Sequence, residues 1–300
     1  MVVSELITDS VVLYSGCCHF VDTMSQQGSR ETREFCNGLW NNWTQKGGSG
    51  KCEGCPAHWS NREDFPGNPE TRESSSGHHP FFGYGSLSDV EVVILGHEPG
   101  TQSIGKEDEN ATNYAQKTFD DARKSDVTRV PVGAGSLELT VPLFNTLSSE
   151  FTVYWSQMKK CNELKSGPEG ANKTAENQCV GIGDDYEGYI REELTTVDPE
   201  YVIGLGTDVD RLLRGVYDIE SLGGTFSREI ATGNSESGLR WLTVQGESFK
   251  YIPTSHPSRG VPSMTKDQIS LDVPDETTAS EHYYQVLADD FVRQVNKGTI

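Results

Sequence analysis

Four cysteines constrain the fold of this chain more than any other feature of its sequence. Cys52 and Cys55 form a C-x-x-C pair, and Cys161 and Cys179 follow much later. Thiolates that arrive as one close pair and two distant single ligands can close a tetrahedral metal site or an iron–sulfur cluster from separate parts of a fold. The pair precedes an expected strand at residues 90–95, and the later cysteines are expected to flank a loop after a second strand. We therefore expect a metal centre that joins distant segments beside a sheet.

The cysteine count favours metal ligation over disulfide bonds. Seven cysteines are an odd number, without the density of a disulfide scaffold, and this usage fits a reducing cytoplasm. The three that remain, Cys17, Cys18 and Cys36, are expected to be small buried apolar side chains. On chemical grounds alone the four ligands accept zinc as well as iron, since both bind tetrahedral sulfur.

Length and composition predict one main domain. A chain of 300 residues with 34% hydrophobic content buries one substantial core, so we expect an N-terminal extension at residues 1–28 and a single domain at residues 29–300. No apolar run reaches the roughly 18 residues that a membrane span needs. The first 17 residues lack a basic leader, which argues against a signal peptide. We expect a cytoplasmic protein, with a monomer as the default.

The formal net charge of -20, from 45 acidic and 25 basic side chains, predicts a solvated and self-repelling surface. One interpretation is adaptation to the concentrated salt of a halophile's cytoplasm, and the plainer one is an acidic protein. Acidity does not exclude a nucleic-acid partner. At ~1 M salt the Debye length is only about 3 Å, so only groups in contact with a phosphate decide binding.

Short apolar runs alternate with helical patterns along the chain. The runs, which are typical of buried strands, lie at residues 90–95, 151–155, 201–205, 239–244 and 251–253. Helical periodicity is found at residues 29–43, 186–197, 207–216 and 280–295, and the polar residues 61–79 are expected to form a surface loop. This alternation predicts a three-layer α/β fold, in which helices flank a central, mostly parallel sheet of four or five strands.

Two strand exits carry polar side chains suited to chemistry. In open α/β sheets, ligands bind in the crevice beyond the carboxyl ends of the strands. The sequence GHEPG at residues 96–100 offers an imidazole and a carboxylate on a rigid turn. The sequence TSHPSR at residues 254–259 offers an imidazole beside a proline, a hydroxyl, and a guanidinium suited to phosphate. Taken singly, neither exit is specific.

Together with the cysteines, these segments resemble the uracil-DNA glycosylase superfamily, and most closely its iron–sulfur branch, usually called family 4. The likeness covers roughly residues 30–295. In that family a C-x-x-C precedes a Gly-x-Gly, a strand and a GEAPG-like turn; this chain has Cys52 and Cys55, then GYG at residues 83–85, then GHEPG. The family's next strand, with a Lys-Cys shortly after it, corresponds to residues 154–161. Cys179, a Pro-led strand ending in Leu-Gly, and an HPS turn complete the same order.

The resemblance implies a monofunctional DNA glycosylase of base-excision repair, which hydrolyses the N-glycosidic bond of a uracil nucleotide flipped out of DNA. It also implies a structural 4Fe-4S cluster on the four cysteines. His256 would donate a hydrogen bond to the departing base, while Ser258 and Arg259 would hold a phosphate. The turn residues Gly96, Pro99 and Gly100 would line the pocket, and Phe119, or else Tyr114, would stack on the base.

Two departures from the family pattern leave the base in question. The family places Glu directly after the first glycine of the turn, whereas this chain has His97 there and Glu98 one place later. Glu98 would then align the attacking water while His97 lines the pocket. Gln157 stands where the family has an Asn that pairs with uracil, and its extra methylene could change base choice. The alternatives are a glycosylase for hypoxanthine or xanthine, and a metal-stabilised nucleic-acid binding protein without turnover.

Overall fold

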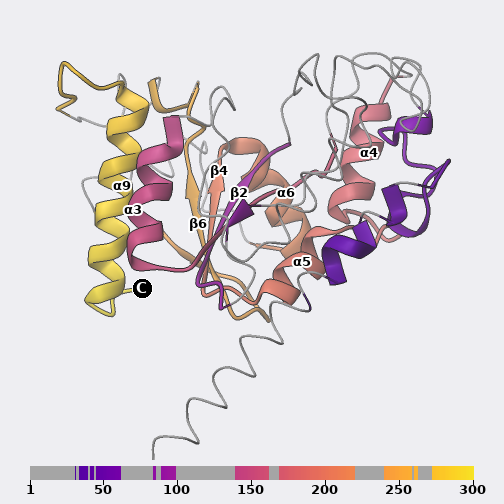
Figure 1. The fold of residues 1–300 in the computed structure, drawn as a ribbon, viewed down its shortest axis with the longest axis horizontal. Coiled ribbons are helices and arrows are strands. Elements are labelled where there is room, and N and C mark those ends of the chain that lie inside the picture. Colours follow the sequence, from indigo (N-terminus) through magenta and orange to yellow (C-terminus); the bar gives the residue numbers. More distant parts are fainter. Residues whose placement is uncertain are drawn as a thin grey trace, which may run out of the picture.

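A six-stranded, mostly parallel sheet forms the centre of the molecule (Figure 1). The computed structural model describes residues 31, 34–39, 41–43, 45–61, 84–85, 89–98, 139–161, 169–219, 240–258, 260–262 and 272–300. Within these ranges the strand order is β1-β3-β2-β4-β6-β5. The four long strands, which are mutually parallel, are β2 (Val92–Gly96), β3 (Val153–Gln157), β4 (Tyr201–Leu205) and β6 (Lys250–Thr254).

Two short antiparallel strands lie at the edges of this sheet. β1 (Tyr84–Gly85) pairs with β3, and β5 (Leu242–Thr243) pairs with β6. The predicted α/β class and the mostly parallel sheet are confirmed. The sheet has one strand more than the expected maximum of five, because the two-residue strand β1 also pairs with it.

Helices cover both faces of the sheet, so its inner strands are buried on both sides, as parallel strands require. Every residue of β2, β3 and β4 is buried. Val92 and Ile94 pack in the same cluster as α3 (Val141–Glu150) and α9 (Ala279–Asn296). Val93 and Leu95 point to the opposite face, where α5 (Ile190–Val197) and α6 (Thr207–Tyr217) pack. The period-two alternation of side chains along a strand therefore divides the core into two layers.

Among the α-helices of ten or more residues that the structure describes, α3 and α4 (Ala171–Val180) have no counterpart in the sequence prediction. α3 lies beside α9 (Figure 1), and α4 carries Cys179 near its last turn. The expectation that Cys179 flanks a loop is therefore wrong. The sequence of α4, ANKTAENQCV, is mostly polar, and only Ala175, Glu176, Cys179 and Val180 are buried, so its apolar stripe is too thin to be recognised by periodicity.

A third packing group joins the N-terminal segment to the sheet domain. Residues 34–39 and 41–43 are helical, within the predicted range 29–43. Phe35, Cys36 and Leu39 of this segment are buried in one cluster with Cys52, Cys179 and Tyr189. Cys36 is thus a small buried apolar side chain, as expected. Cys17, Cys18, the extension at residues 1–28 and nearly all of the loop at residues 61–79 lie outside the described residues.

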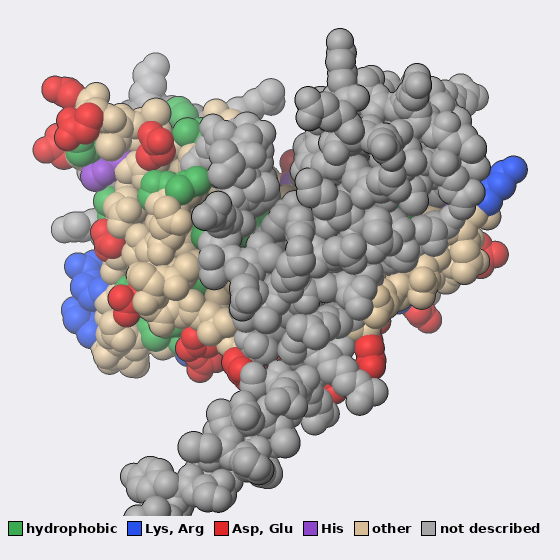
Figure 2. Space-filling model, in the orientation of Figure 1, with side chains coloured by type: hydrophobic (Ala, Val, Ile, Leu, Met, Phe, Trp, Pro, Cys, Tyr) green, Lys and Arg blue, Asp and Glu red, His purple; other side chains and the backbone are tan. Residues whose placement is uncertain are grey.

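Acidic side chains are scattered over the described surface in the view of Figure 2 rather than gathered into one patch. This distribution agrees with the formal net charge of -20 and with a generally solvated surface. Among the helices that the structure describes, none is both long enough and apolar enough to cross a lipid bilayer.

Candidate functional site

The C-x-x-C pair is formed by a short turn that brings its two sulfurs to the same side. Cys52 ends the 3-10 helix η1 (Gly50–Cys52), and the backbone N–H of Cys55 donates to the carbonyl of Cys52 at 3.2 Å. Between them, Gly54 has a φ of 65°, a left-handed conformation that L side chains adopt at a cost. The Gly54 N–H also donates to the Gly47 carbonyl at 3.1 Å. Backbone geometry therefore presets this half of the cysteine centre.

All four predicted ligands meet around one small cavity. Its lining includes Cys52, Cys55, Cys161 and Cys179, with Leu39, Lys51, Ala57, Lys159, Lys160, Ala175 and Tyr189. Cys52 and Cys55 come from the N-terminal turn, Cys161 from the loop after β3, and Cys179 from α4. The cavity between them is small, about 10 Å³, close to the volume that one water molecule needs.

The four thiols influence one another electrostatically, as groups in close proximity do. Burial raises the pKa of Cys52 to about 12, and Cys179 and Cys55 contribute to the rise while the Tyr189 hydroxyl opposes it. Burial, with a contribution from Cys179, raises the pKa of Cys55 to about 11. Burial also raises the pKa values of Cys161 and Cys179. A metal bound here would have to displace thiol protons, which makes its affinity dependent on pH.

Hydrogen bonds are directed at two of the sulfurs. The backbone N–H of Lys160 donates to Cys179 Sγ at 3.1 Å. The Tyr189 hydroxyl lies 3.1 Å from Cys52 Sγ and accepts from Asn42 Nδ2 at 3.0 Å, which leaves its proton for the sulfur. Donors to sulfur are what thiolate ligands of metal centres and clusters receive. No group of three or more His, Cys, Asp or Glu side chains within the described ranges has the arrangement of a site for a single metal ion.

A fully buried ion pair involves Lys160, the residue that precedes Cys161. Lys160 Nζ contacts Glu193 Oε2 of α5, and the two side chains are 1% and 0% exposed. Lys160 Nζ also donates to Ser156 Oγ at 2.8 Å and to the Gln157 carbonyl at 2.9 Å. Glu193 Oε1 accepts from Tyr154 at 2.9 Å and from Ser156 at 2.7 Å. These hydrogen bonds satisfy both charges and join β3, the cysteine loop and α5.

The two predicted strand exits lie at the same edge of the sheet. β2 ends at Gly96 and β6 at Thr254, and β4 lies between them, pairing in parallel with both. On the other side of β2, Gly96 is in register with Gln157, the last residue of β3. Because parallel strands end at one edge, the turns after residues 96 and 254 and the amide of Gln157 gather there.

Gly96 and Gln157 are in unusually close contact. A Cβ placed on Gly96 would lie 2.2 Å from Gln157 Oε1 and 2.8 Å from both its Cδ and its Nε2. The Gln157 side chain is therefore laid against the bare backbone of Gly96, and Gln157 is only 1% exposed. Its Oε1 has no hydrogen-bond partner in the part of the chain that the structure describes. A buried acceptor without a donor is costly, and this one is located where a ligand is expected.

The geometry of the HPS turn fixes the tautomer of the exposed His256 ring. The Ser258 backbone N–H donates to His256 Nδ1 at 3.2 Å, and Ser258 Oγ lies 3.0 Å from the same nitrogen. Since Nδ1 accepts, a neutral ring carries its proton on Nε2. The turn is fastened to α9, where Tyr284 and Ser280 donate to the carbonyls of Ser255 and Pro257.

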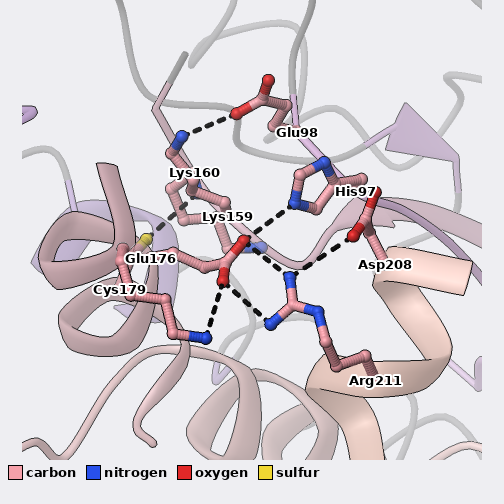
Figure 3. Close-up of polar contacts among 9 residues, drawn as sticks. His97, Glu98, Lys159, Lys160, Glu176, Cys179, Asp208 and Arg211 are labelled. Carbon is pink, nitrogen blue, oxygen red and sulfur yellow. Dashed lines mark hydrogen bonds and ion pairs between the residues drawn. The ribbon is translucent and has the colours of Figure 1, made fainter. Parts of the chain in front are cut away.

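The turn that bears His97 and Glu98 is held by charged side chains on both sides (Figure 3). Lys159 Nζ lies 2.6 Å from Glu98 Oε2, and Glu176 Oε2 lies 3.1 Å from His97 Nε2. The backbone contributes as well, because the Lys159 N–H donates to the His97 carbonyl at 2.9 Å. Both candidate groups of the turn are thus in ion pairs or charge-assisted hydrogen bonds.

Glu176, which contacts His97, also contacts a charged side chain of α6. It contacts Arg211 of α6 through both carboxylate oxygens, at 3.0 and 3.1 Å, and Arg211 also reaches Asp208 at 3.4 Å (Figure 3). Burial tends to raise the pKa of Glu176, but the Arg211 and His97 contacts outweigh it and hold that pKa below 4.5. Glu176 therefore remains an anion at neutral pH.

The structure thus places the predicted residues in three groups: the four cysteines around the cavity, the pair Gly96 and Gln157 beside the His97–Glu98 turn, and the His256–Ser258 turn two strands away. Four predicted binding residues, Pro99, Gly100, Phe119 and Arg259, lie outside the described residues, as does Tyr114.

Sequence reasoning missed Lys159, Lys160, Glu176, Glu193 and Arg211. The adjacent lysines just before Cys161 were a signal for the first two, since a lysine beside buried cysteines needs an anionic partner. Glu176 stands three residues before Cys179, on the same helical face, but that relation holds only once α4 is known to be a helix.

Comparison with protein-family models and with curated proteins found no match to this chain.

Proposed function

We propose that this protein is a DNA glycosylase that hydrolyses the N-glycosidic bond of uracil, or of another deaminated base, in DNA. The observation that carries the proposal is one edge of the sheet, where Gln157 ends β3 and the His256 imidazole follows β6, with β2 and β4 between these two strands. The buried amide oxygen of Gln157 has no hydrogen-bond partner among the described residues. The order of sequence segments that resembles the uracil-DNA glycosylase superfamily supports the same conclusion. We further propose a cytoplasmic monomer that acts on DNA.

The Gln157 oxygen, which has no hydrogen-bond partner among the described residues, favours a base that presents an N–H donor. Uracil, hypoxanthine and xanthine all carry a lactam, in which a ring N–H stands next to a carbonyl. Cytosine and adenine, the parents of uracil and hypoxanthine, have an acceptor nitrogen at that position, so a buried acceptor discriminates against them. Guanine, the parent of xanthine, carries the same lactam and is not separated from it by this group. The Gln157 amide would accept from the lactam N–H through Oε1 and donate to a base carbonyl through Nε2. This argument supports deaminated bases as a class and leaves the choice among them to experiment.

His256 has the tautomer that the departing base requires. As the glycosidic bond stretches, the sugar becomes cationic and the base anionic, so the site must stabilise both charges. Because Nδ1 accepts from Ser258, the Nε2–H of a neutral ring would donate to the base carbonyl oxygen, on which negative charge develops. This hydrogen bond strengthens as charge builds up, which is the condition for lowering the barrier.

Glu98 would orient the attacking water. Its ion pair with Lys159 uses Oε2, so Oε1 is the oxygen that would accept from a water beside the sugar. His97 is held by Glu176 and would contribute to the wall of the pocket. The same two contacts favour the alternative function, a nucleic-acid binding protein without turnover, because they engage both groups of the turn.

The cysteine centre would hold a 4Fe-4S cluster, with zinc as the alternative, on Cys52, Cys55, Cys161 and Cys179. Its contribution would be structural, since hydrolysis needs no electrons and these ligands join the N-terminal segment to the Cys161 loop and to α4. Purified protein should be brown and carry about four irons per chain, as such a cluster requires. Stoichiometric zinc without iron in folded protein would contradict the assignment.

The function is tested with oligonucleotides that each carry one altered base, incubated with metal-intact protein in high salt. Alkali then cleaves any abasic site. Cleavage at uracil, hypoxanthine or xanthine, with none at cytosine, adenine or guanine, is the expected result. Binding to the same oligonucleotides without cleavage at any base would select the binding-protein alternative. Cleavage of cytosine and adenine as fast as that of uracil and hypoxanthine would contradict the role given to Gln157.

A further inference from the structure

We propose that Lys159 and Glu176 are positioning residues, which connect the cysteine centre to the turn that bears His97 and Glu98. The inference rests on the function proposed above, because it assigns Glu98 a water to orient. It concerns two side chains that come from two different cysteine-bearing segments and reach the same turn (Figure 3).

Lys159 is the first connection. It stands two residues before Cys161 and lines the cavity with the four cysteines, while its Nζ lies 2.6 Å from Glu98 Oε2. The lysine side chain is 3% exposed and that of Glu98 is 22% exposed. An ion pair shielded from water in this way restrains orientation far more than an exposed pair does. The backbone N–H of Lys159 also holds the His97 carbonyl, so one residue fixes both the main chain and the carboxylate of the turn.

Glu176 is the second connection. It lies one helical turn before Cys179 in α4, and its side chain is 11% exposed. Its Oε2 lies 3.1 Å from His97 Nε2, and Arg211 binds both of its oxygens from α6. A two-oxygen contact with a guanidinium fixes the plane of the carboxylate. The His97 ring is therefore oriented by a group that is itself fixed on two helices.

The cysteine centre would affect the reaction through these two connections. Each connection is only a few residues from a cysteine, Lys159 from Cys161 and Glu176 from Cys179. The arrangement of these cysteines, which a bound metal centre would hold, would therefore be passed on to Lys159 and Glu176, and through Lys159 to Glu98, without contact with the substrate. An error of about 1 Å in such a group can cost a factor of about a hundred in rate.

The test uses the full-length, metal-containing protein with four variants: Lys159→Met, Lys159→Arg, Glu176→Gln and, as a control, Lys297→Met. Lys297 is an exposed lysine at the end of α9. Lys159→Met should slow single-turnover base release by about 10- to 100-fold while changing the Kd for DNA less than about threefold. Lys159→Arg should retain most of the rate, Glu176→Gln should slow release to a smaller extent, and Lys297→Met should leave it unchanged.

A double-mutant cycle assigns the effect to Glu98. In a Glu98→Gln background, Lys159→Met should cost less than about threefold, because the carboxylate that it positions is gone. Equal losses in the two backgrounds would overturn the proposal. So would a Lys159→Met protein that is as fast as the wild type.

Amide hydrogen exchange supplies a readout that needs no activity. Peptides covering residues 89–98 should exchange faster in Lys159→Met and Glu176→Gln than in the wild type or in Lys297→Met. If the wild type releases no base but exchange changes as expected, the proposed function fails and the connection stands. If the wild type is active while exchange and release are unchanged in Lys159→Met and Glu176→Gln, the connection fails and the function stands.

Discussion

Replacing Gly96 with alanine should damage the candidate base site by displacing Gln157. The added Cβ would lie 2.2 Å from Gln157 Oε1, about 1.2 Å closer than the 3.4 Å at which ordinary contact begins, and 2.8 Å from Cδ and Nε2. Gln157 is 1% exposed and Gly96 is its partner in the β2–β3 register. The amide therefore has to rotate or the strands have to separate.

The expected losses of stability and of rate can both be estimated. Overpacking by one methyl group in a closely packed interior costs about 1–3 kcal/mol of unfolding free energy. A displacement of about 1 Å in a group that positions the substrate costs about a hundredfold in rate. We therefore expect Gly96→Ala to lose both stability and base release, with release losing more than the fraction of folded protein would explain.

Two assays and one control test this expectation. Urea unfolding followed by the fluorescence of the buried Trp155 and Trp43 gives the stability, and single-turnover release of uracil gives the rate. Gly38→Ala is the control, since Gly38 is in the helical residues 34–39 and nothing lies within 4 Å of its added Cβ. It should stabilise the protein by about 0.4–1 kcal/mol and leave the rate unaltered. A Gly96→Ala protein that matches the wild type in both assays would refute the reasoning.

Three further outcomes are expected. Lys160→Met should lower the unfolding free energy by about 3–5 kcal/mol, because Glu193 stays fully buried without its cation. Adding Glu193→Gln should restore most of this loss. Urea unfolding measures both variants, and a double variant as unstable as the single one would contradict the coupling of the two residues. His256→Ala should slow base release by about 100- to 1,000-fold and barely alter the Kd for DNA, whereas similar losses in both would disagree with its role as a donor. Thr278→Ala should cost about 1 kcal/mol at neutral pH, as the loss of a helix N-cap does. The Thr278 hydroxyl and backbone N–H lower the pKa of Glu281 below 4.5, so the contribution of this capping box is complete above that pH and is lost as pH falls through the lowered pKa; a stability difference between wild type and variant that does not shrink in acid would contradict it.

Much of the fold follows from local sequence patterns. The apolar run at residues 201–205 coincides with β4, and the run at residues 251–253 lies within β6. The helix predicted at residues 207–216 lies within α6, and the helix predicted at residues 280–295 lies within α9. The strand predicted at residues 90–95 starts two residues and ends one residue before β2, and the strand predicted at residues 151–155 lies two residues before β3 at both ends. The polar residue Gln157 and the glycine Gly96 end these strands, and neither belongs to an apolar run. The same two residues define the close contact in the candidate site.

The sequence by itself determined the α/β class, the cysteine set and the two polar strand exits, because apolar periodicity and motif spacing are local properties of a chain. Only the tertiary structure decided which charges meet. Lys159 and Glu98 are 61 residues apart in the chain, and His97 and Glu176 are 79 apart, so no periodicity relates them. Their contacts arise because parallel strands end at one edge of the sheet, where α4, α6 and the Cys161 loop also converge. Burial then makes these contacts strong, since a buried charge must find a partner.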